Sequence, residues 1–377
     1  MNTDEIKSFI LENKQLMFDT LKELCAIPAP SHLENERAVY CKKWLEKVGA
    51  SGVYIDDALN TVFPLNCENQ NEITVFAAHT DTVFPDTAPM PYLDDGEKIH
   101  CPGVADDTAS VVVLLLMAKF FIEKNSVPQK GVMFVCDSCE EGLGNLKGTR
   151  QIFKDYEGRI ASFISFESSL DNIRDTCVGS HRYEVEVTTD GGHSFGAFGN
   201  ENAIAKLAEI VSEIYKIEVP VIGNSKTTYN VGEISGGTSV NTIAQNAKML
   251  CEYRSDNKEC LGIMKEKFEM IFERAANEKV SVNVKMVGER PCGCVDGGKQ
   301  EKLRSLTVPI VEEVIGKSVR LSSSSTDCNI PLSLGVPAFC LGVSRAKCIH
   351  TRQEYLVKDS MFSGLEIAIK AGLALNM

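Results

Sequence analysis

Four short runs of apolar residues limit the folds that are open to this chain. Residues 73–78, 132–135, 163–166 and 338–343 are largely apolar on both faces, which is typical of buried strands. Residues 109–121, between the first two runs, form a longer apolar stretch of the length of a buried helix. The order strand, helix, strand predicts crossover connections. We therefore expect an α/β domain with a mixed, largely parallel sheet flanked by helices.

The middle of the chain has a different pattern, which indicates a second domain. A length of 377 residues suits two domains of roughly 100–200 residues each. Two N-terminal stretches, 5–25 and 34–48, have helical spacing of their apolar residues. In the middle, alternating strand-like and helical stretches follow one another at 183–187, 202–215, 247–253 and 264–276. We predict a catalytic domain of residues 1–181 and 292–377 with an inserted α+β unit of residues 182–291.

Composition restricts the partners and the compartment. The formal charge of −13, from 39 basic and 52 acidic residues, repels nucleic acid and anionic membranes. The longest apolar run, 111–118, is shorter than the ~20 residues of a membrane span. The first residues lack the order of a secretory signal, and the fourteen cysteines fit reduced core thiols. We expect a cytoplasmic protein with neither nucleic-acid nor membrane partners.

Residues of the types that bind metals follow the predicted strands. Ligands of open α/β sheets bind outside the carboxyl ends of the strands. The residues at or near these ends, together with an acidic pair before the long helix, are His79, Asp81, Asp106, Asp107, Glu140, Glu141, Glu167 and His350. A single histidine after a strand is usually structural, and an acidic pair is usually a solvated loop. Because five loops agree in residue type and position, we expect these side chains to meet on one rim.

Such a mixed set of donors predicts metal-dependent hydrolysis. Imidazole and carboxylate ligands suit Zn²⁺, with Co²⁺ or Mn²⁺ as substitutes, and this set is large enough for two ions. In two-metal hydrolases the ions lie roughly 3.5–4 Å apart and share a bridging carboxylate. A further carboxylate must stay off the metals to accept a proton from water. Glu140 and Glu141 offer one residue for each task.

Five motifs together carry a resemblance to a known family. They are His79-Thr80-Asp81-Thr82-Val83, Gly103-Val104-Ala105-Asp106-Asp107, Glu140-Glu141-Gly142, Gly191-Gly192-His193-Ser194 and Gly236-Gly237-Thr238-Ser239-Val240-Asn241. The chain, from about residue 20 to its C-terminus, resembles the di-zinc metallopeptidase family of peptidase T, aminoacylase, acetylornithine deacetylase and glutamate carboxypeptidase. Thr108 departs from the lysine or bulkier residue of many members, which leaves the subfamily open.

The resemblance implies a role for each residue of the rim except Asp107. One zinc ion would be held by His79 and Glu167, and the other by Glu141 and His350. Asp106 would bridge the two ions and be followed by a cis peptide bond. Glu140 would be the general base, and Asp81 would fix the tautomer of His79, with a capping role in the next turn as its alternative.

The inserted unit resembles the ferredoxin-like dimerisation domain of this family. His193 would reach into the active site of a partner subunit of a homodimer and stabilise the oxyanion. Asn241 and Arg254 match positions that bind carboxylate or carbonyl groups of the substrate. The alternatives are a structural role for His193 in its glycine turn, and a surface ion pair of Arg254 with Asp256.

The substrate and three rival functions stay open at this point. The strings 228–232 and 236–238 look most like the peptidase T-like branch, so we favour an exopeptidase acting on small peptides over an N-acyl-amino-acid deacylase. A non-catalytic metal-binding homologue would lack part of the ligand set. Cys136 and Cys139 with Cys292 and Cys294 form a weaker candidate zinc or redox site. A serine hydrolase is disfavoured, since no G-x-S-x-G string supports one.

Overall fold

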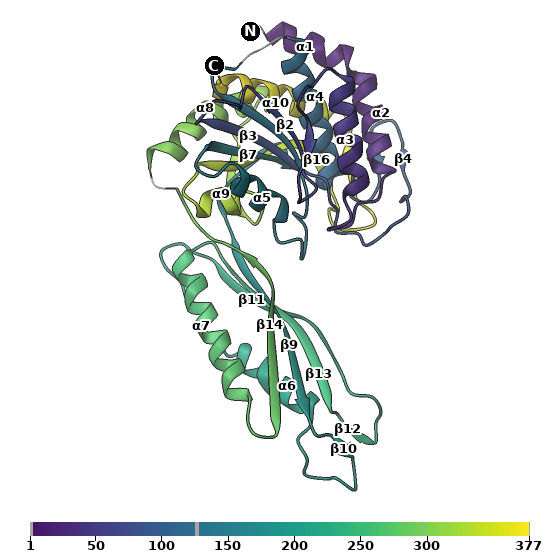
Figure 1. Ribbon diagram of the computed structural model, residues 1–377, viewed down its shortest axis with the longest axis vertical. Coiled ribbons are helices and arrows are strands. Elements are labelled where there is room, and N and C mark those ends of the chain that lie inside the picture. The colour runs from purple at the N-terminus through teal and green to yellow at the C-terminus, as the bar shows by residue number, and fades with distance from the viewer. Residues whose placement is uncertain (1–2, 125–127, 296, 377) are drawn as a thin grey trace. The chain divides into compact units, whose positions relative to one another are not determined.

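The chain forms two compact units (Figure 1). The computed structural model describes residues 3–124, 128–295 and 297–376. The first unit comprises Met1–Cys177 and Cys294–Met377, and the second unit is Val178–Gly293.

The first unit is built on a mixed sheet of eleven strands. Their bounds are β1 (Tyr54–Ile55), β2 (Thr61–Leu65), β3 (Ile73–His79), β4 (Leu93–Asp94), β5 (Lys98–His100), β6 (Gly131–Asp137), β7 (Ile160–Ser168), β8 (Asn172–Cys177), β15 (Arg320–Ser324), β16 (Ala338–Lys347) and β17 (Tyr355–Val357). The main order is β1-β2-β6-β3-β7-β16-β17-β5-β4, with β8 beside β16 and β15 beside β8. The four central strands, β6, β3, β7 and β16, are parallel. The mixed sheet is confirmed, but parallel pairing is concentrated in its centre, because β2 and β17 join the central strands in antiparallel fashion.

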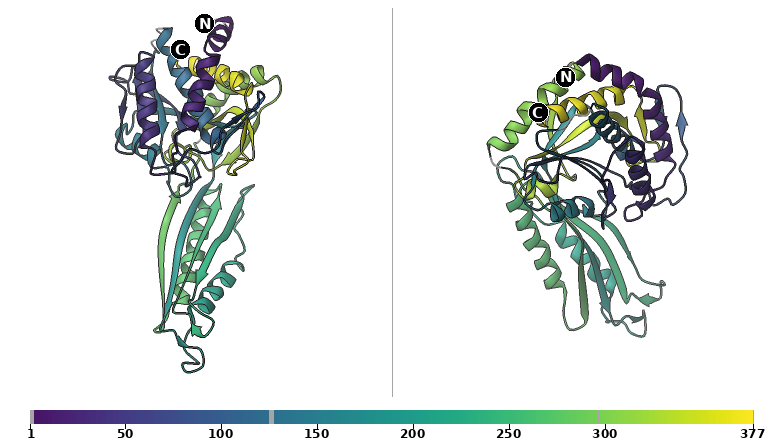
Figure 2. Two further views of the ribbon diagram at one scale, coloured as in Figure 1. Left: turned by 90° about the vertical axis from the view of Figure 1, so that its right-hand side faces the viewer. Right: turned by 45° about the horizontal axis from the view of Figure 1, so that its top comes forward.

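Helices cover both faces of this sheet (Figure 2). One face packs its phenylalanines, Phe76, Phe134 and Phe166 among them, in a core shared with α4 (Ala109–Glu123) and α10 (Ser360–Asn376). On the other face Phe153 of α5 (Lys147–Asp155) contacts Phe163. The remaining helices are α1 (Thr3–Glu12), α2 (Lys14–Cys25), α3 (Asn35–Lys47), α8 (Gly298–Ile315), α9 (Asn329–Ser333) and the π-helical turn η1 (Val104–Thr108). Because both faces are covered, every residue of β3 and β6 is buried.

The N-terminal stretch predicted as one helix is two helices. α1 ends at Glu12 and α2 begins at Lys14. Between them, the side chain of Asn13 donates a hydrogen bond to the Phe9 carbonyl, 2.8 Å away. A side chain that competes for a helical carbonyl favours a break, and apolar spacing alone does not reveal it.

The second unit is a four-stranded antiparallel sheet with two helices. Its elements are β9 (Gly179–Thr189), β10 (Gly192–His193), α6 (Ala203–Ile214), β11 (Thr227–Gly236), β12 (Thr242–Ile243), β13 (Asn246–Ser255), α7 (Lys258–Ala275) and β14 (Val280–Arg290). The sheet order is β11-β13-β9-β14, and β10 pairs with β12 in a separate ribbon. Tyr253 of β13 packs on Phe268 of α7 with ring centroids 4.7 Å apart, so helix and sheet share an aromatic core.

The structure bears on two expectations drawn from composition, one about membrane spans and one about the cysteines. Within the described residues, no helix combines the length and apolarity that crossing a membrane requires. All fourteen cysteines are free thiols, and all but Cys294 and Cys348 are buried. Most cysteines therefore serve as small core residues.

Candidate functional site

The predicted metal-binding side chains of the first unit converge at the carboxyl ends of the parallel strands. His79 is the last residue of β3 and pairs in register with Asp137, the last residue of β6. Glu140 and Glu141 follow β6, Glu167 lies near the end of β7, and His350 follows β16. Three overlapping groups have donor atoms within 4.8 Å of one another: His79 with Asp106 and Asp107, His79 with Glu140 and Glu141, and Asp106 with Glu141 and His350.

Asp106 lies between the two histidines and directs one oxygen to each. Its Oδ1 is 3.1 Å from His79 Nε2, and its Oδ2 is 3.0 Å from His350 Nε2. The peptide bond between Asp106 and Asp107 is cis. Hydrogen bonds with both histidines keep the Asp106 pKa below its ordinary value, although burial acts in the opposite direction. An ionised carboxylate with one oxygen on each side has the geometry of a bridging ligand.

His350 and Glu141 form the second half of the cluster. His350 Nε2 lies 3.0 Å from Glu141 Oε1, the same distance that separates it from Asp106. Hydrogen bonds with Asp106 and Glu141 raise the pKa of His350 to about 10. Burial raises the pKa of Glu141. A protonated His350 therefore lies against two carboxylates and offsets part of their negative charge, which a divalent cation would offset more fully.

Asp81 organises both His79 and the segment of the two glutamates. Its Oδ1 is 3.3 Å from His79 Nδ1, and Ser31 donates a hydrogen bond of 2.6 Å to its Oδ2. The backbone N–H groups of Glu140 and Glu141 each donate to Asp81 at 3.0 Å. Burial opposes ionisation of Asp81, but His79 and Ser31 hold its pKa below the usual range. One carboxylate thus orients an imidazole and fixes the two neighbouring glutamates.

Glu140 is buried and lies in the group with His79 and Glu141. Its backbone N–H donates to Asp81 at 3.0 Å, which fixes the main chain at this position. A buried carboxylate beside the donor cluster is placed to exchange a proton with a reacting water.

Glu167 lies further from the cluster than the other candidate ligands. It is in none of the three tight groups, and its Oε2 is 3.6 Å from an Nη of Arg174. Burial raises the Glu167 pKa to about 7, opposed by Arg174 and reinforced by Asp106. Sequence reasoning missed Arg174, because no apolar run predicted β8 and an arginine is usually a solvated residue.

Asp107 is a potential donor to which sequence reasoning gave no role. It is fully buried, and among the described residues neither of its carboxylate oxygens has a hydrogen-bond partner. Burial, with the charges of Glu167 and Asp106, raises its pKa well above the ordinary value. Buried carboxylates at such density need cations or protons for compensation, so the donor set fits a pair of metal ions.

A buried arginine forms hydrogen bonds with the segments that carry His79 and Asp106. Arg37, in α3, is only 3% exposed, and it donates to the Thr80 carbonyl at 2.9 Å and to the Thr108 hydroxyl at 3.1 Å. Thr108 in turn donates to the Gly103 carbonyl at 2.6 Å. Thr108, which departs from the family pattern, thus links Arg37 to the turn of Asp106. No sequence signal identified Arg37, since its partners are backbone carbonyls and a threonine hydroxyl elsewhere in the chain.

His193 and Asn241 lie together in the second unit. His193 is exposed in β10, where its Nδ1 accepts the N–H groups of Phe195 and Gly196, each at 3.2 Å. This arrangement places the proton of the neutral ring on Nε2. Asn241 is also exposed, and its backbone oxygen accepts the N–H of Ser194 at 2.9 Å. The two predicted residues therefore share one ribbon.

Arg254 is paired within the second unit. Its guanidinium donates two hydrogen bonds to Glu252, at 2.7 and 3.0 Å. Asp256, the partner considered from sequence, instead accepts the backbone N–H of Lys226 at 2.8 Å. The ion pair is therefore formed with a different acid, and a substrate role for Arg254 stays a prediction.

Cysteine chemistry has little support at this site. Burial and the neighbouring Glu34 raise the pKa of the Cys139 thiol to about 12, so it stays protonated at neutral pH. None of the three candidate metal groups in the described chain contains a cysteine.

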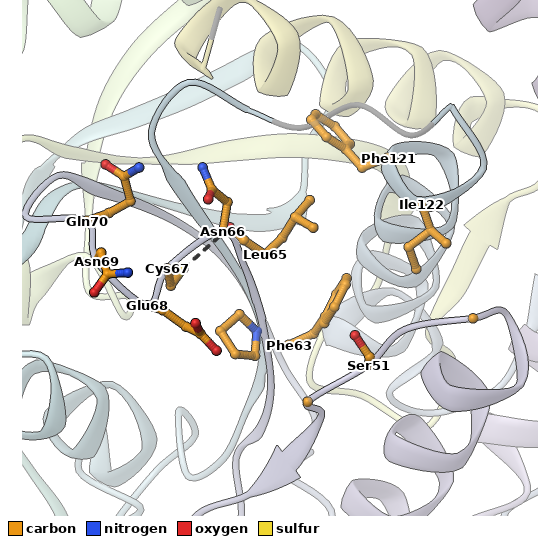
Figure 3. Close-up of a pocket in the computed structure, with 13 residues that line it drawn as sticks. Ser51, Phe63, Leu65, Asn66, Cys67, Glu68, Asn69, Gln70, Phe121 and Ile122 are labelled. Atoms are coloured by element: carbon orange, nitrogen blue, oxygen red, sulfur yellow. Dashed lines mark hydrogen bonds between the residues drawn. The ribbon is translucent and has the colours of Figure 1, made fainter.

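A hollow at the edge of the sheet is chemically different (Figure 3). Its volume is about 670 Å³, and Phe63, Leu65, Asn66 and Phe121 are part of its wall. Among its described lining residues Glu68 is the one carboxylate, and none is a histidine. The metal-type chemistry is therefore concentrated at the strand ends.

Comparison with known proteins identifies the family. Residues 75–372 match Peptidase family M20/M25/M40. The chain belongs to this family. Membership confirms the resemblance read from the motifs, and it makes the protein a metal-dependent hydrolase of peptide or amide bonds.

Relatives of the M20 chain align along almost its full length. It is 23% identical to the uncharacterized protein YqjE of Bacillus subtilis, covering 95% of this chain and 97% of the relative. It is 22% identical to a succinyl-diaminopimelate desuccinylase of Corynebacterium glutamicum, covering 88% and 89%.

Solved structures show the same fold. Aminopeptidase PepT of Bacillus cereus superposes with a TM-score of 0.73 at 21% identity, covering 95% of this chain and 98% of that one. The M20 metallo-carboxypeptidase Sso-CP2 of Sulfolobus solfataricus gives 0.77 at 16% identity, with 94% and 98% covered. YXEP of Bacillus subtilis, described as a dinuclear metal binding M20 peptidase, gives 0.64 at 14%, with 98% and 100% covered.

Proposed function

We propose that this protein is a dinuclear exopeptidase that removes a terminal residue from small peptides. The observation that carries the proposal is the position of Asp106, whose two carboxylate oxygens lie 3.1 and 3.0 Å from the imidazoles of His79 and His350. The two ions would be Zn²⁺, with Co²⁺ or Mn²⁺ as substitutes. Their ligands would be His79, Asp106, Glu141, Glu167 and His350.

The ligands divide between the two ions around the shared carboxylate. His79 and Glu167 would hold one ion, Glu141 and His350 the other, and Asp106 both. The position of Glu141, 3.0 Å from His350 Nε2, supports their pairing on one ion. Bound divalent cations supply a Lewis acid for the scissile carbonyl and acidify a water molecule.

Glu140 would be the general base. It would accept the proton of the attacking water and later deliver it to the leaving amine, so that the carboxylate is regenerated in each turnover. Its burial keeps bulk water from competing for the proton, and the Asp81 hydrogen bond to its backbone holds it in place. Asp81 also fixes the His79 tautomer by lying 3.3 Å from Nδ1.

The residues 182–291 would form a homodimerisation domain that adds His193 to the site of the partner. His193 is exposed with a protonated Nε2 directed away from its own backbone partners, which suits an oxyanion donor. Asn241, on the same ribbon, and Arg254 would bind the substrate. A mixture of Glu140→Gln and His193→Ala proteins should regain activity through hybrid dimers. A mixture without activity would contradict the proposal that His193 acts in the active site of the partner subunit.

An N-acyl-amino-acid deacylase is the second candidate. It is favoured by the likeness to a relative that is named a desuccinylase.

The buried free thiols also support a cytoplasmic location for either enzyme.

A matched substrate panel distinguishes the candidates. Zinc-loaded protein would be incubated with free dipeptides and tripeptides beside N-acetyl and N-succinyl amino acids, with products identified by mass spectrometry. Cleavage of free peptides is the expected result and reveals which end is trimmed. Cleavage of the acylated compounds alone would replace the exopeptidase with the deacylase.

A further inference from the structure

We propose that Glu354 is a positioning residue that holds the bridging carboxylate of Asp106 and joins it mechanically to the loop of His350. The inference rests on the proposed metal centre and adds a residue to it. Glu354 is not itself a candidate ligand, because its carboxylate is engaged with backbone groups.

The Glu354 carboxylate accepts three backbone hydrogen bonds from the turn that carries Asp106. Its Oε1 accepts the N–H groups of Ala105 at 2.8 Å and Asp106 at 3.1 Å, and its Oε2 accepts that of Gly103 at 3.0 Å. The side chain is 1% exposed, so water does not compete for these bonds. These bonds satisfy three N–H groups that would otherwise be buried without an acceptor.

The turn needs such an acceptor because its backbone is irregular. Asp106 and Asp107 have non-helical dihedral angles within η1, and Gly103 has a φ of 74°. A side chain at Gly103 would also meet Thr82, since an added Cβ would lie 2.6 Å from Thr82 Cγ2. Buried N–H groups in such a turn lack the usual helical acceptors, and Glu354 supplies them.

Hydrogen bonds hold both the N–H groups and a carbonyl group of this turn. Glu354 binds N–H groups, while Arg37 acts through the Thr108 hydroxyl on the Gly103 carbonyl. The N–H and the carbonyl of Gly103 are therefore both fixed, two residues before Ala105 and three before Asp106. This leaves little freedom for the Asp106 carboxylate to turn away from the two histidines.

Glu354 also belongs to the segment that presents His350. Its own N–H donates to the Thr351 carbonyl at 3.1 Å, in the short turn after His350. The next residue, Tyr355, begins β17, which pairs with β5 immediately before the Asp106 turn. One side chain thus joins two segments about 250 residues apart that contribute ligands to the same proposed ion. Loss of this link should weaken metal binding while the fold persists.

The test is zinc affinity of Glu354→Gln, compared with Glu312→Gln as a matched control. Glu312 also accepts a backbone N–H, that of Val319 at 3.0 Å, but it lies on α8 and contacts no candidate ligand. Stripped proteins would be titrated with Zn²⁺ against a chromophoric chelator, and their thermal midpoints would be measured before and after loading. Glu354→Gln should bind Zn²⁺ at least tenfold more weakly and gain less thermal stability on loading, while Glu312→Gln stays within twofold of the unaltered protein.

Three outcomes would contradict the inference, and the third uses a further variant that guards against misfolding. If the unaltered protein binds two ions and Glu354→Gln binds them equally well, Glu354 has no positioning role. If the unaltered protein binds no ions, the proposed metal centre falls, and this inference with it. Should Glu354→Gln fail to fold, Glu354→Asp keeps the charge but cannot span all three N–H groups, and it should again weaken zinc binding at least severalfold. Unchanged binding by that folded variant would overturn the inference.

Discussion

At the strand ends, protons and metal ions compete for the same carboxylate oxygens and imidazole nitrogens. His350 lies 3.0 Å from oxygens of both Asp106 and Glu141, and these two acids raise its pKa to about 10. The pKa of Glu167 is raised to about 7, chiefly by burial. A metal ion requires the neutral imidazole and the ionised carboxylates, so it must displace these protons.

Zinc loading should therefore release protons at neutral pH. At pH 7.5 the raised pKa keeps His350 protonated before loading, so about one proton or more should leave per pair of ions. Apparent zinc affinity should rise as pH increases from 6 to 9. Calorimetric titrations in two buffers of different ionisation enthalpy measure the release. Equal heats in both buffers would contradict the proton-bearing cluster.

The residues that converge could be located from sequence, whereas their supports could not. His79, Glu140 and Glu167 end or follow apolar runs, and strand ends of a parallel sheet meet at one edge. Glu354 and Arg37 act on backbone groups far along the chain, and such contacts leave no pattern in residue type. Sequence reading therefore finds donors more readily than the groups that hold them.

Among the elements, the central strands were predictable and the outer ones were not. Runs such as 132–135 are apolar on both faces because helices cover the sheet on both sides. Edge elements such as β4, which is exposed at both positions, lack that signal. The close approach of α10 to β16 is equally invisible, since it requires a glycine at one position of the helix. Gly364 of α10 lies against Val343, where an added Cβ would be 1.7 Å from the Val343 oxygen.

Gly364→Ala should destabilise the first unit. The added methyl group forces α10 away from β16, and overpacking of this kind costs about 1–3 kcal/mol in the free energy of unfolding. Denaturant unfolding measures the change. The matched control is Gly262→Ala in α7, where an added Cβ meets nothing within 4 Å and should be neutral or slightly stabilising. Equal effects of the two substitutions would contradict the close packing of α10 on β16.

The stability of the whole molecule should fall in acid, because the second unit contains a buried histidine. His181 Nδ1 lies 2.6 Å from the Tyr253 hydroxyl, inside the aromatic core between β9, β13 and α7. Burial lowers its pKa below the ordinary 6.5, so the imidazole stays neutral in the folded unit. Between this lowered value and 6.5 the unfolded chain binds more protons than the folded one, and stability falls as pH decreases.

His181→Gln should flatten that pH dependence. Thermal midpoints of the unaltered protein should drop between pH 7 and pH 5, with a smaller drop for the variant. Substitution of the half-buried His100, which pairs with Asp95 in the first unit, serves as the control and should leave the dependence in place. Parallel curves for the unaltered protein and His181→Gln would show that other groups control the acid response.

The most direct measurement compares metal content and turnover of Glu140→Gln with those of His350→Ala. The proposed roles predict that Glu140→Gln keeps two zinc ions per chain and loses peptide hydrolysis by at least about 10²–10⁴-fold. His350→Ala should lose zinc together with activity, because its imidazole is a proposed ligand. Activity retained by Glu140→Gln, or full zinc content in His350→Ala, would contradict the two-metal site with Glu140 as its base.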